Sequence, residues 1–110
     1  MFRTHFLDDA IRKRKQRLEQ ERKTHLQEVI RTLTLEGPRL GLREAYVVGS
    51  VTQEDAWTED SDVDVAMSGG DPLEVMKIVE QSVGRAVDVI DLDGHPVPEM
   101  FRRRGIRVVG

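Results

Sequence analysis

Two stretches of the sequence decide the fold: AYVVGS at residues 45–50 and DVDVAM at residues 62–67. The first is a short apolar run that ends in Gly-Ser, which predicts a buried strand leading directly into a turn. The second alternates polar and apolar residues with period two and predicts another strand. Residues two apart on a strand share a face, with Cα atoms roughly 6.5 Å apart, so Asp62 and Asp64 converge.

A helix and a third strand are predicted next along the chain. Asp71 followed by proline is typical of a helix start, and Gly84 marks the end of that helix. The following run AVDVIDL, residues 86–92, predicts a strand. Because this strand is the more apolar one, we expect it to be more central in the sheet.

Asp88 is conspicuous within that apolar run, because a buried charge needs a partner. A neighbouring strand could bring it beside Asp62 and Asp64. Asp91 points to the opposite face, so we interpret it as a strand-end cap or a solvent contact.

The alternative for Asp62 and Asp64 is that both simply face solvent on a half-exposed strand. Like charges on one strand face are destabilising unless a cation lies between them, which favours a cation site.

The amino-terminal region, residues 1–36, predicts one long amphipathic helix without proline or glycine between residues 5 and 35. Apolar residues are dense only from Leu26 onward, so we expect the second half to pack on the domain. The first half would project or meet another chain. Gly37-Pro38 and Gly41 predict a loop after the helix.

A short helix at residues 98–104 and a closing strand at residues 106–109 complete the predicted elements. The expected fold class is α/β (α+β): a small mixed β-sheet flanked by helices, in one domain spanning residues 1–110. Residues 44–110 would form its catalytic core. The 110 residues contain no cysteine and no apolar run of membrane-spanning length, so we expect a cytoplasmic protein without disulfides or thiolate sites.

The order of strand, Gly49-Ser50, Asp62-x-Asp64 on a second strand and Asp88 on a third resembles the polymerase-β-like nucleotidyltransferase superfamily. The closest resemblance is to its minimal nucleotidyltransferase branch, and it runs from residue 45 to residue 110. By this resemblance, the glycine and serine would bind the β- and γ-phosphates of a nucleoside triphosphate.

The resemblance further implies that Asp62 and Asp64 bind magnesium and that Asp88 completes the site for a second magnesium ion. A hydroxyl of the acceptor would attack the α-phosphorus of ATP, and pyrophosphate would leave. Two cations would activate the attacking oxygen and neutralise the leaving one. The catalytic and metal-binding residues are therefore expected to be the same three aspartates.

The loop after Ser50 departs from the pattern of this branch. Members commonly have basic residues and another glycine there, whereas this chain has VTQE at residues 51–54 and one extra residue. Four arginines could substitute, although a solvated helix face is the favoured interpretation for most of them: Arg85, Arg102, Arg103 and Arg104. Trp57 would either stack on a base or be pinned against the body of the domain.

We therefore expect a nucleotidyltransferase that transfers AMP from ATP to a hydroxyl of a macromolecule. Minimal nucleotidyltransferases are often antitoxins, and the resemblance implies a tyrosine of a helical HEPN-type toxin as an acceptor. The projecting helix would suit such a partner or a second copy of the chain. Its basic residues are mixed with Glu19 and Glu21, which favours a solvated face over a nucleic-acid interface.

Two other functions are compatible with the pattern. A non-catalytic binding module would keep the fold, and the altered loop after Ser50 favours it, whereas the complete set of three carboxylates opposes it. A small-molecule transferase of the antibiotic-modifying type would need a second domain for its acceptor, and we expect no second domain within these 110 residues.

Overall fold

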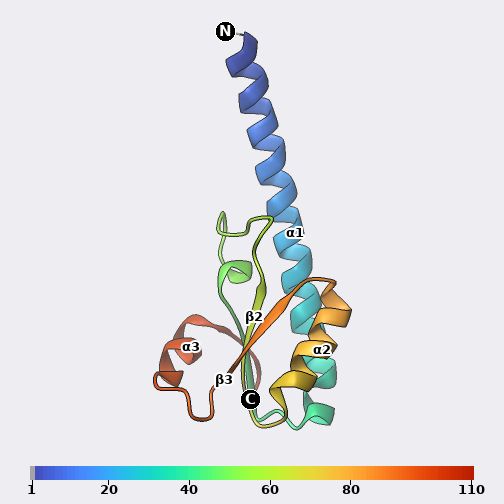
Figure 1. Ribbon diagram of the computed structural model, residues 1–110, viewed down its shortest axis with the longest axis vertical. Coiled ribbons are helices and arrows are strands. Elements are labelled where there is room, and N and C mark those ends of the chain that lie inside the picture. The colour runs from blue at the N-terminus through green and yellow to red at the C-terminus, as the bar shows by residue number, and fades with distance from the viewer. Residues whose placement is uncertain (1) are drawn as a thin grey trace.

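The computed structural model describes residues 2–110, with side chains described from His5 onward. Three helices and a four-stranded sheet make up the molecule (Figure 1). In chain order the elements are α1 (Phe2–Leu40), β1 (Glu44–Val48), the 3₁₀ turn η1 (Ser50–Thr52), β2 (Val63–Ser68), α2 (Pro72–Val83), β3 (Val87–Asp91), α3 (Pro98–Arg104) and β4 (Ile106–Val109). The predicted fold class, with its long first helix, is confirmed.

The sheet is mixed, and its strand order is β3-β2-β1-β4. Strand β1 pairs antiparallel with β2 and β4, whereas β2 and β3 are parallel and are joined through α2. The prediction that the third strand is central was wrong: β3 lies at an edge. The chain leaves β3 through α3 and returns as β4 on the far side of β1, so within residues 2–110 no strand pairs with the outer edge of β3.

The two faces of the sheet are covered differently. Helices α1 and α2 cover one face (Figure 1), where Val65 and Met67 of β2 are fully buried against a core that includes Val29 and Leu33 of α1. The other face carries a smaller cluster formed by Tyr46, Val48, Ala66 and Leu92, with Ile90 and Phe101 packed against it. The short α3 lies over this second face, where its Phe101 packs against the cluster.

Helix α1 continues to Leu40, so the prediction of a loop at Gly37-Pro38 was wrong. Gly37 lies against β4: a Cβ added there would sit 3.0 Å from Val109 Cγ2. The helix ends at Gly41, whose amide donates to the carbonyl of Pro38. Tertiary packing of the last turn against β4 therefore outweighs the helix-breaking preference of glycine and proline.

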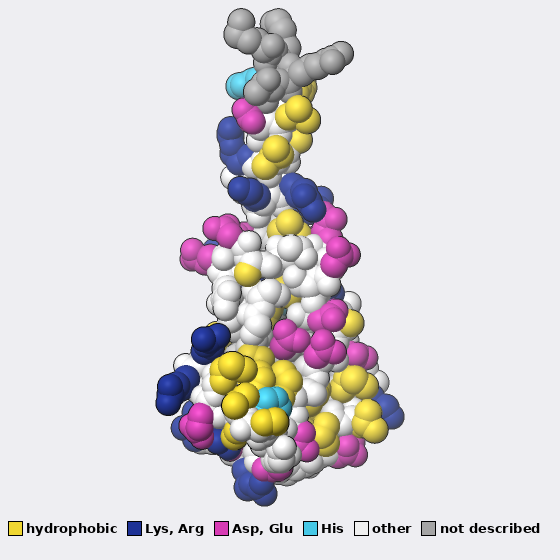
Figure 2. Space-filling model, turned by 60° about the vertical axis from the view of Figure 1, so that its left-hand side comes forward, with side chains coloured by type: hydrophobic (Ala, Val, Ile, Leu, Met, Phe, Trp, Pro, Cys, Tyr) yellow, Lys and Arg dark blue, Asp and Glu magenta, His cyan; other side chains and the backbone are white. Residues whose placement is uncertain are grey.

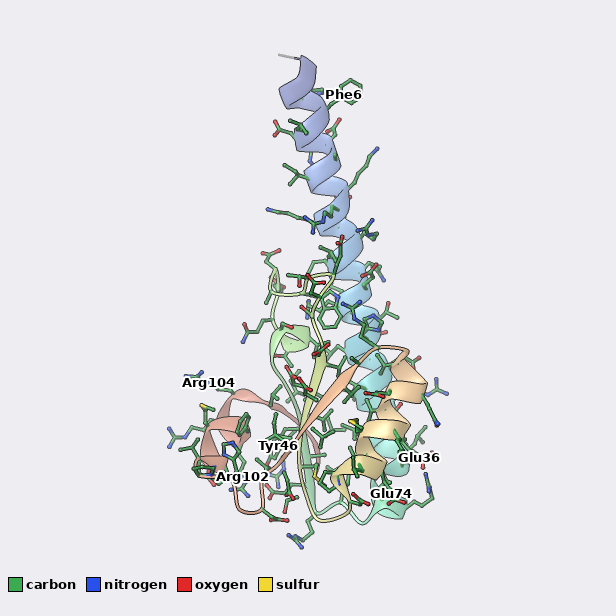
Figure 3. All side chains as sticks on the ribbon, viewed as in Figure 1. Phe6, Glu36, Tyr46, Glu74, Arg102 and Arg104 are labelled. Atoms are coloured by element: carbon green, nitrogen blue, oxygen red, sulfur yellow. The ribbon has the colours of Figure 1, made fainter. Side chains whose placement is uncertain are left out.

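The docked part of α1 begins earlier than the sequence predicts. Leu18 and Arg22 are already buried, whereas Phe6, Leu7 and Ile11 are between 53% and 75% exposed. The amino-terminal turns extend away from the sheet (Figure 3, with Phe6 near the tip). None of the helices in the described part of the chain combines the length and hydropathy needed to span a membrane.

Helix α2 begins and ends where its sequence predicts. Asp71 Oδ1 accepts a hydrogen bond of 2.9 Å from the amide of Leu73, and Gly84 ends the helix in the left-handed conformation. Val75, Val79 and Val83 form its buried face. This crossover helix sets β3 parallel to β2, which is the arrangement that the candidate site needs.

Candidate functional site

The sheet brings the three predicted carboxylates to one face. Asp64 of β2 and Asp88 of β3 are direct register partners, and neighbouring strands lie roughly 4.8 Å apart. Asp62 immediately precedes β2, and strand alternation places it on the same side as Asp64. This is the face turned away from α1 and α2, because the intervening Val63 and Val65 are fully buried on the helical side.

The electrostatics of this cluster are unfavourable without a cation. Burial raises the pKa of the Asp64 carboxyl, and the nearby charges of Asp88 and Asp62 raise this pKa further. In the part of the chain that the structure describes, none of the three side chains accepts a hydrogen bond or forms an ion pair. Hard cations such as Mg²⁺ prefer carboxylate oxygens, so the donor set fits magnesium.

The three carboxylates lie on one face of the sheet, but they do not surround a single metal position. Among the described residues, no group of three or more Asp, Glu or His side chains is arranged as a ready-made metal site. The roles of Asp62, Asp64 and Asp88 as metal ligands therefore stay a prediction, supported by strand register and charge.

The Gly49-Ser50 turn is seated directly on this cluster. Gly49 has φ of 79°, and a Cβ at this position would overlap Asp64 Oδ2. Its carbonyl accepts hydrogen bonds from Thr52, 3.1 Å from the amide and 2.7 Å from the hydroxyl. Both the backbone conformation and the lack of space require glycine here. The predicted phosphate-binding turn and the predicted metal ligand thus touch each other.

A cavity of about 390 Å³ adjoins the turn, a volume suited to a small ligand. Its polar wall includes Asp64 and Gln53, and its apolar wall includes Ile90 and Phe101. Arg104 lies at its edge. The cavity therefore combines an apolar surface, an amide side chain, a carboxylate and a guanidinium within one hollow.

Of the four arginines considered as substitutes for the missing basic residues, Arg104 alone lines this cavity. It is exposed and, within the described chain, forms no ion pair or hydrogen bond through its side chain. Arg102 is held by Glu44, at 2.8 and 2.9 Å, and by Glu99. Figure 3 shows Arg102 and Arg104 on the same short helix.

Arg85 has a structural role. Its guanidinium donates to the carbonyls of Thr58, Glu59 and Ser61, which shapes the loop between η1 and β2. It also lies 4.8 Å from the ring centroid of Trp57. These contacts occupy Arg85 away from the cavity.

Trp57 is pinned against the body of the domain. Only 3% of its surface is exposed, and its ring centroid lies 5.5 Å from that of His25 on α1. Of the two interpretations of this tryptophan, base stacking is therefore excluded in this conformation. Asp91 Oδ1 accepts from the amide of Asp93 at 3.0 Å, which confirms its interpretation as a strand-end cap.

A second hollow of about 430 Å³ adjoins the first one beside α3, and Met100 and Arg104 line both. Val97 and Met100 are 52% and 42% exposed. Figure 2 shows hydrophobic side chains gathered in the lower part of this face, beside Lys and Arg side chains. The candidate site therefore opens onto an exposed, partly apolar surface.

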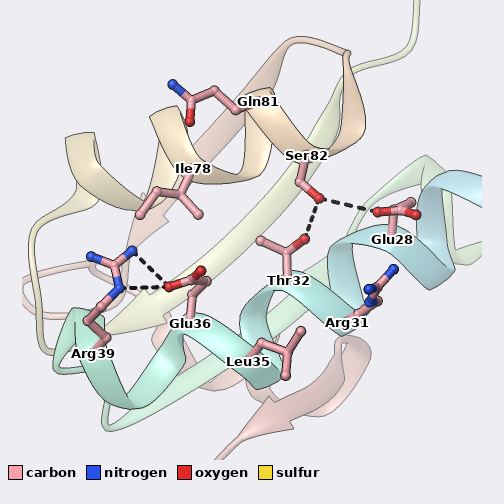
Figure 4. A pocket seen from close by; sticks show the side chains of 9 residues that line it. All are labelled: Glu28, Arg31, Thr32, Leu35, Glu36, Arg39, Ile78, Gln81 and Ser82. Atoms are coloured by element: carbon pink, nitrogen blue, oxygen red, sulfur yellow. Dashed lines mark hydrogen bonds and ion pairs between the residues drawn. The ribbon is translucent and has the colours of Figure 1, made fainter.

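Another groove lies between α1 and α2 and measures about 450 Å³ (Figure 4). Its polar groups bind one another: Ser82 joins Thr32 at 2.6 Å and Glu28 at 3.2 Å, and Arg39 pairs with Glu36. The carboxylate cluster is on the opposite face of the sheet, so this groove belongs to the helical layer and not to the site.

The sequence prediction missed two residues of α1, Arg22 and Glu19, that contact the segment after Ser50. The Arg22 guanidinium donates to the carbonyl of Val51, immediately after Ser50. The available signal was its position: Arg22 lies on the apolar stripe of α1, midway between Leu18 and Leu26. A charged residue at such a position is a candidate for a specific buried contact.

No protein-family model matches the chain, and no curated protein matches it. The chain is similar to several solved structures, of which three are described. A chain from a toxin-antitoxin structure with AMP-PNP has 22% identity and a TM-score of 0.58, over 76% of this chain and 72% of that chain. A chain from a mutant of the toxin-antitoxin MntA-HpeT has 20% identity and a TM-score of 0.56, over 76% and 71%. A chain from the toxin-antitoxin MntA-HepT has 19% identity and a TM-score of 0.52, over 80% and 72%. The chain therefore shares its fold with chains of these toxin-antitoxin structures.

Proposed function

We propose that this protein is a magnesium-dependent nucleotidyltransferase that transfers AMP from ATP to a hydroxyl of a macromolecular acceptor. One observation carries the proposal: Asp64 and Asp88 are register partners without a cationic partner, and Gly49 packs directly against Asp64. The shared fold supports it, as does the neighbour that was crystallised with AMP-PNP.

In this proposal Asp62, Asp64 and Asp88 would hold two magnesium ions, which would supply charge neutralisation for the triphosphate and the leaving pyrophosphate. Gly49 and Ser50 bind the β- and γ-phosphates, and the turn fixes where the chain of phosphates ends.

Arg104 supplies positive charge that the loop after Ser50 lacks, and the 390 Å³ cavity beside it receives the nucleoside. The reaction forms a bond between the acceptor oxygen and the α-phosphorus. It breaks the bond from that phosphorus to the pyrophosphate oxygen and releases the proton of the hydroxyl.

The acceptor in this proposal is a partner protein, with a tyrosine of a HEPN-type toxin as the leading candidate and an antitoxin role for this chain. The three similar chains come from toxin-antitoxin structures. The exposed surface beside Arg104 and the projecting part of α1 offer places for a partner, and Phe6, Leu7 and Ile11 are exposed there. A second copy of the chain is the alternative partner for α1.

The second candidate function is a partner-binding module that uses the fold without turnover. The observation that favours it is the loop itself: residues 51–54 contain no basic side chain, whereas the projecting helix exposes large apolar ones. Both functions predict a protein partner, so partner binding does not separate them. Nucleotide turnover does.

The test is transfer of label from α-labelled ATP, with magnesium, to protein and RNA of the source cell. We expect the double variant Asp62→Asn/Asp64→Asn to lose transfer by roughly a thousandfold or more, because it cannot hold the cations. Asp91→Asn is the matched control, since Asp91 lies on the opposite face of β3 and caps a turn.

Label that appears with the wild type and with Asp91→Asn, but not with the double variant, would support the nucleotidyltransferase and identify the acceptor class. If the folded wild type labels nothing above the double variant with any of the four nucleotides and its native partner, the binding module is the correct function.

A further inference from the structure

Side chains of helix α1 bind the backbone immediately after the Gly49-Ser50 turn. The Arg22 side chain is only 7% exposed, and its Nη1 donates to the carbonyl of Val51 at 3.1 Å. Its Nε and Nη2 donate to Glu19 at 3.0 and 2.8 Å. Val51 itself is fully buried. The guanidinium thus bridges one carboxylate of α1 and one backbone carbonyl of the turn.

The same pair also fixes the far end of this segment. Glu19 Oε2 accepts from the amide of Asp55 at 3.3 Å, so two neighbouring side chains of α1 hold residues 51 and 55. Two residues before Glu19 on α1, Arg17 pairs with Glu59 at 2.9 Å. The segment from η1 through the following loop is therefore attached to α1 at residues 51, 55 and 59.

Stability alone does not explain this pair, in which the Arg22 side chain is 7% exposed and the Glu19 side chain is 26% exposed. Removing two charges from water costs about as much as their attraction returns, and apolar replacements of buried ion pairs are often equally stable. In this protein, the pair holds the carbonyl of Val51 and the amide of Asp55 against α1. On the other side of the turn, Gly49 leaves no space against Asp64, so a small displacement of the turn would disturb the carboxylate cluster.

We infer that Arg22 is a positioning residue for the nucleotide site: from α1, it fixes the turn that binds the phosphates. This inference rests on the function proposed above. The loop contributes no basic residue of its own at positions 51–54, and the helix supplies the anchoring guanidinium from outside the site. Arg22 acts through Val51 and does not touch the nucleotide.

The test compares Arg22→Lys and Arg22→Met with a matched control, Arg39→Lys. Arg39 also pairs with a glutamate three residues earlier on α1, at 2.7 Å from Glu36, but this pair is exposed and lies far from the loop. A lysine at position 22 keeps the charge and loses the fork that contacts two partners at once. Arg22→Met keeps an apolar side chain of similar length in the buried position.

We expect faster amide hydrogen exchange at residues 49–55 in both Arg22 variants. We also expect kcat/KM for ATP to fall about ten- to a hundredfold at temperatures well below unfolding, because a displacement of about 1 Å is enough for such a loss. Arg39→Lys should match the wild type in both measurements. A purely structural role would lower the unfolding temperature and leave kcat/KM unchanged.

The outcomes separate this inference from the proposed function. Unchanged exchange at residues 49–55, or full kcat/KM in folded Arg22→Lys, overturns the positioning role while the nucleotidyltransferase stands. A wild type that neither binds nor turns over any nucleotide overturns the proposed function, and with it the role of Arg22 in nucleotide placement.

Discussion

The two faces of the sheet have different roles. On strand β2, Val63, Val65 and Met67 are fully buried on the helical side, while Asp64 and the preceding Asp62 lie on the other side. One face is apolar and closed, and the other holds uncompensated charge beside a cavity. Alternate residues of one strand therefore have different roles: those on the helical face stabilise the fold, and those on the other face belong to the candidate site.

The largest effect of a single substitution is expected at the turn. Gly49→Ala should lower nucleotide turnover about a hundredfold, because the new Cβ must displace either the turn or Asp64. The measurement is label transfer from ATP at saturating magnesium. The matched control is Gly94→Ala, which has a similar positive φ of 86° and nothing within 4 Å of the new Cβ.

Gly94→Ala should cost only the strain of the left-handed conformation, roughly 1–2 kcal/mol of unfolding free energy. If the two alanine variants have equal turnover, activity does not require the close packing of the turn against Asp64.

The apolar face is tested by Val65→Ala, one residue from Asp64. We expect the free energy of unfolding to fall by about 2 kcal/mol, because two methyl groups leave a fully buried position and create a cavity. Urea unfolding followed by circular dichroism measures this loss. Turnover per folded molecule should stay close to the wild-type value; a large fall in turnover would show that the two faces are coupled.

Arg104→Gln tests the open face with a smaller change. We expect the affinity for ATP to weaken about tenfold, because Arg104 is exposed and its contact to phosphate is taken at about 1.5 kcal/mol, the lower end for a charge-assisted hydrogen bond. The unfolding temperature should not change, because Arg104 forms no ion pair in the described chain. Arg103→Gln on the same helix is the control. If both variants lose the same ATP affinity, the loss comes from general surface charge and not from a specific contact of Arg104.

The smallest effect concerns how α3 is attached to β1. The hydrogen bond from Arg102 holds the pKa of the Glu44 carboxyl below its ordinary value, and the hydroxyl of Tyr46 contributes further. A lowered folded-state pKa gives stability that is present above the unfolded-state pKa and is lost as the pH falls through the folded value.

Arg102→Met should therefore lower the unfolding temperature at neutral pH, and the difference from the wild type should shrink as the pH falls below about 4.3. Thermal unfolding at a series of pH values measures this. A difference that stays constant with pH would assign the effect to lost packing of the arginine side chain instead of to the ion pair.

Local sequence signals predicted much of the fold. The alternation around Asp64 predicted β2, and the pair Asp71-Pro72 with Gly84 predicted α2 at its observed bounds. These signals are local because a strand face, a helix cap and a left-handed residue each depend on a few neighbours. The shared face of Asp62 and Asp64 followed from strand periodicity alone.

The errors concern contacts between distant segments. Whether α1 stops at Gly37 depends on Val109, and whether β3 is central depends on where β4 pairs. Arg104 was one of four candidate arginines, and only the packing of α3 against the sheet distinguishes it from Arg102. Arg22 was missed because its partner carbonyl lies 29 residues away. Periodicity contains no information about such pairings.

The projecting part of α1 also determines how the protein moves through solution. The radius of gyration is 16.2 Å and the principal extents are 57 × 27 × 18 Å, whereas a compact chain of this length would have a radius of gyration of about 13 Å. A rod on a small globule experiences more friction than a sphere of equal mass. A monomer will therefore elute early from a gel-filtration column and resemble a dimer there, so subunits must be counted by light scattering or sedimentation equilibrium, which do not depend on shape.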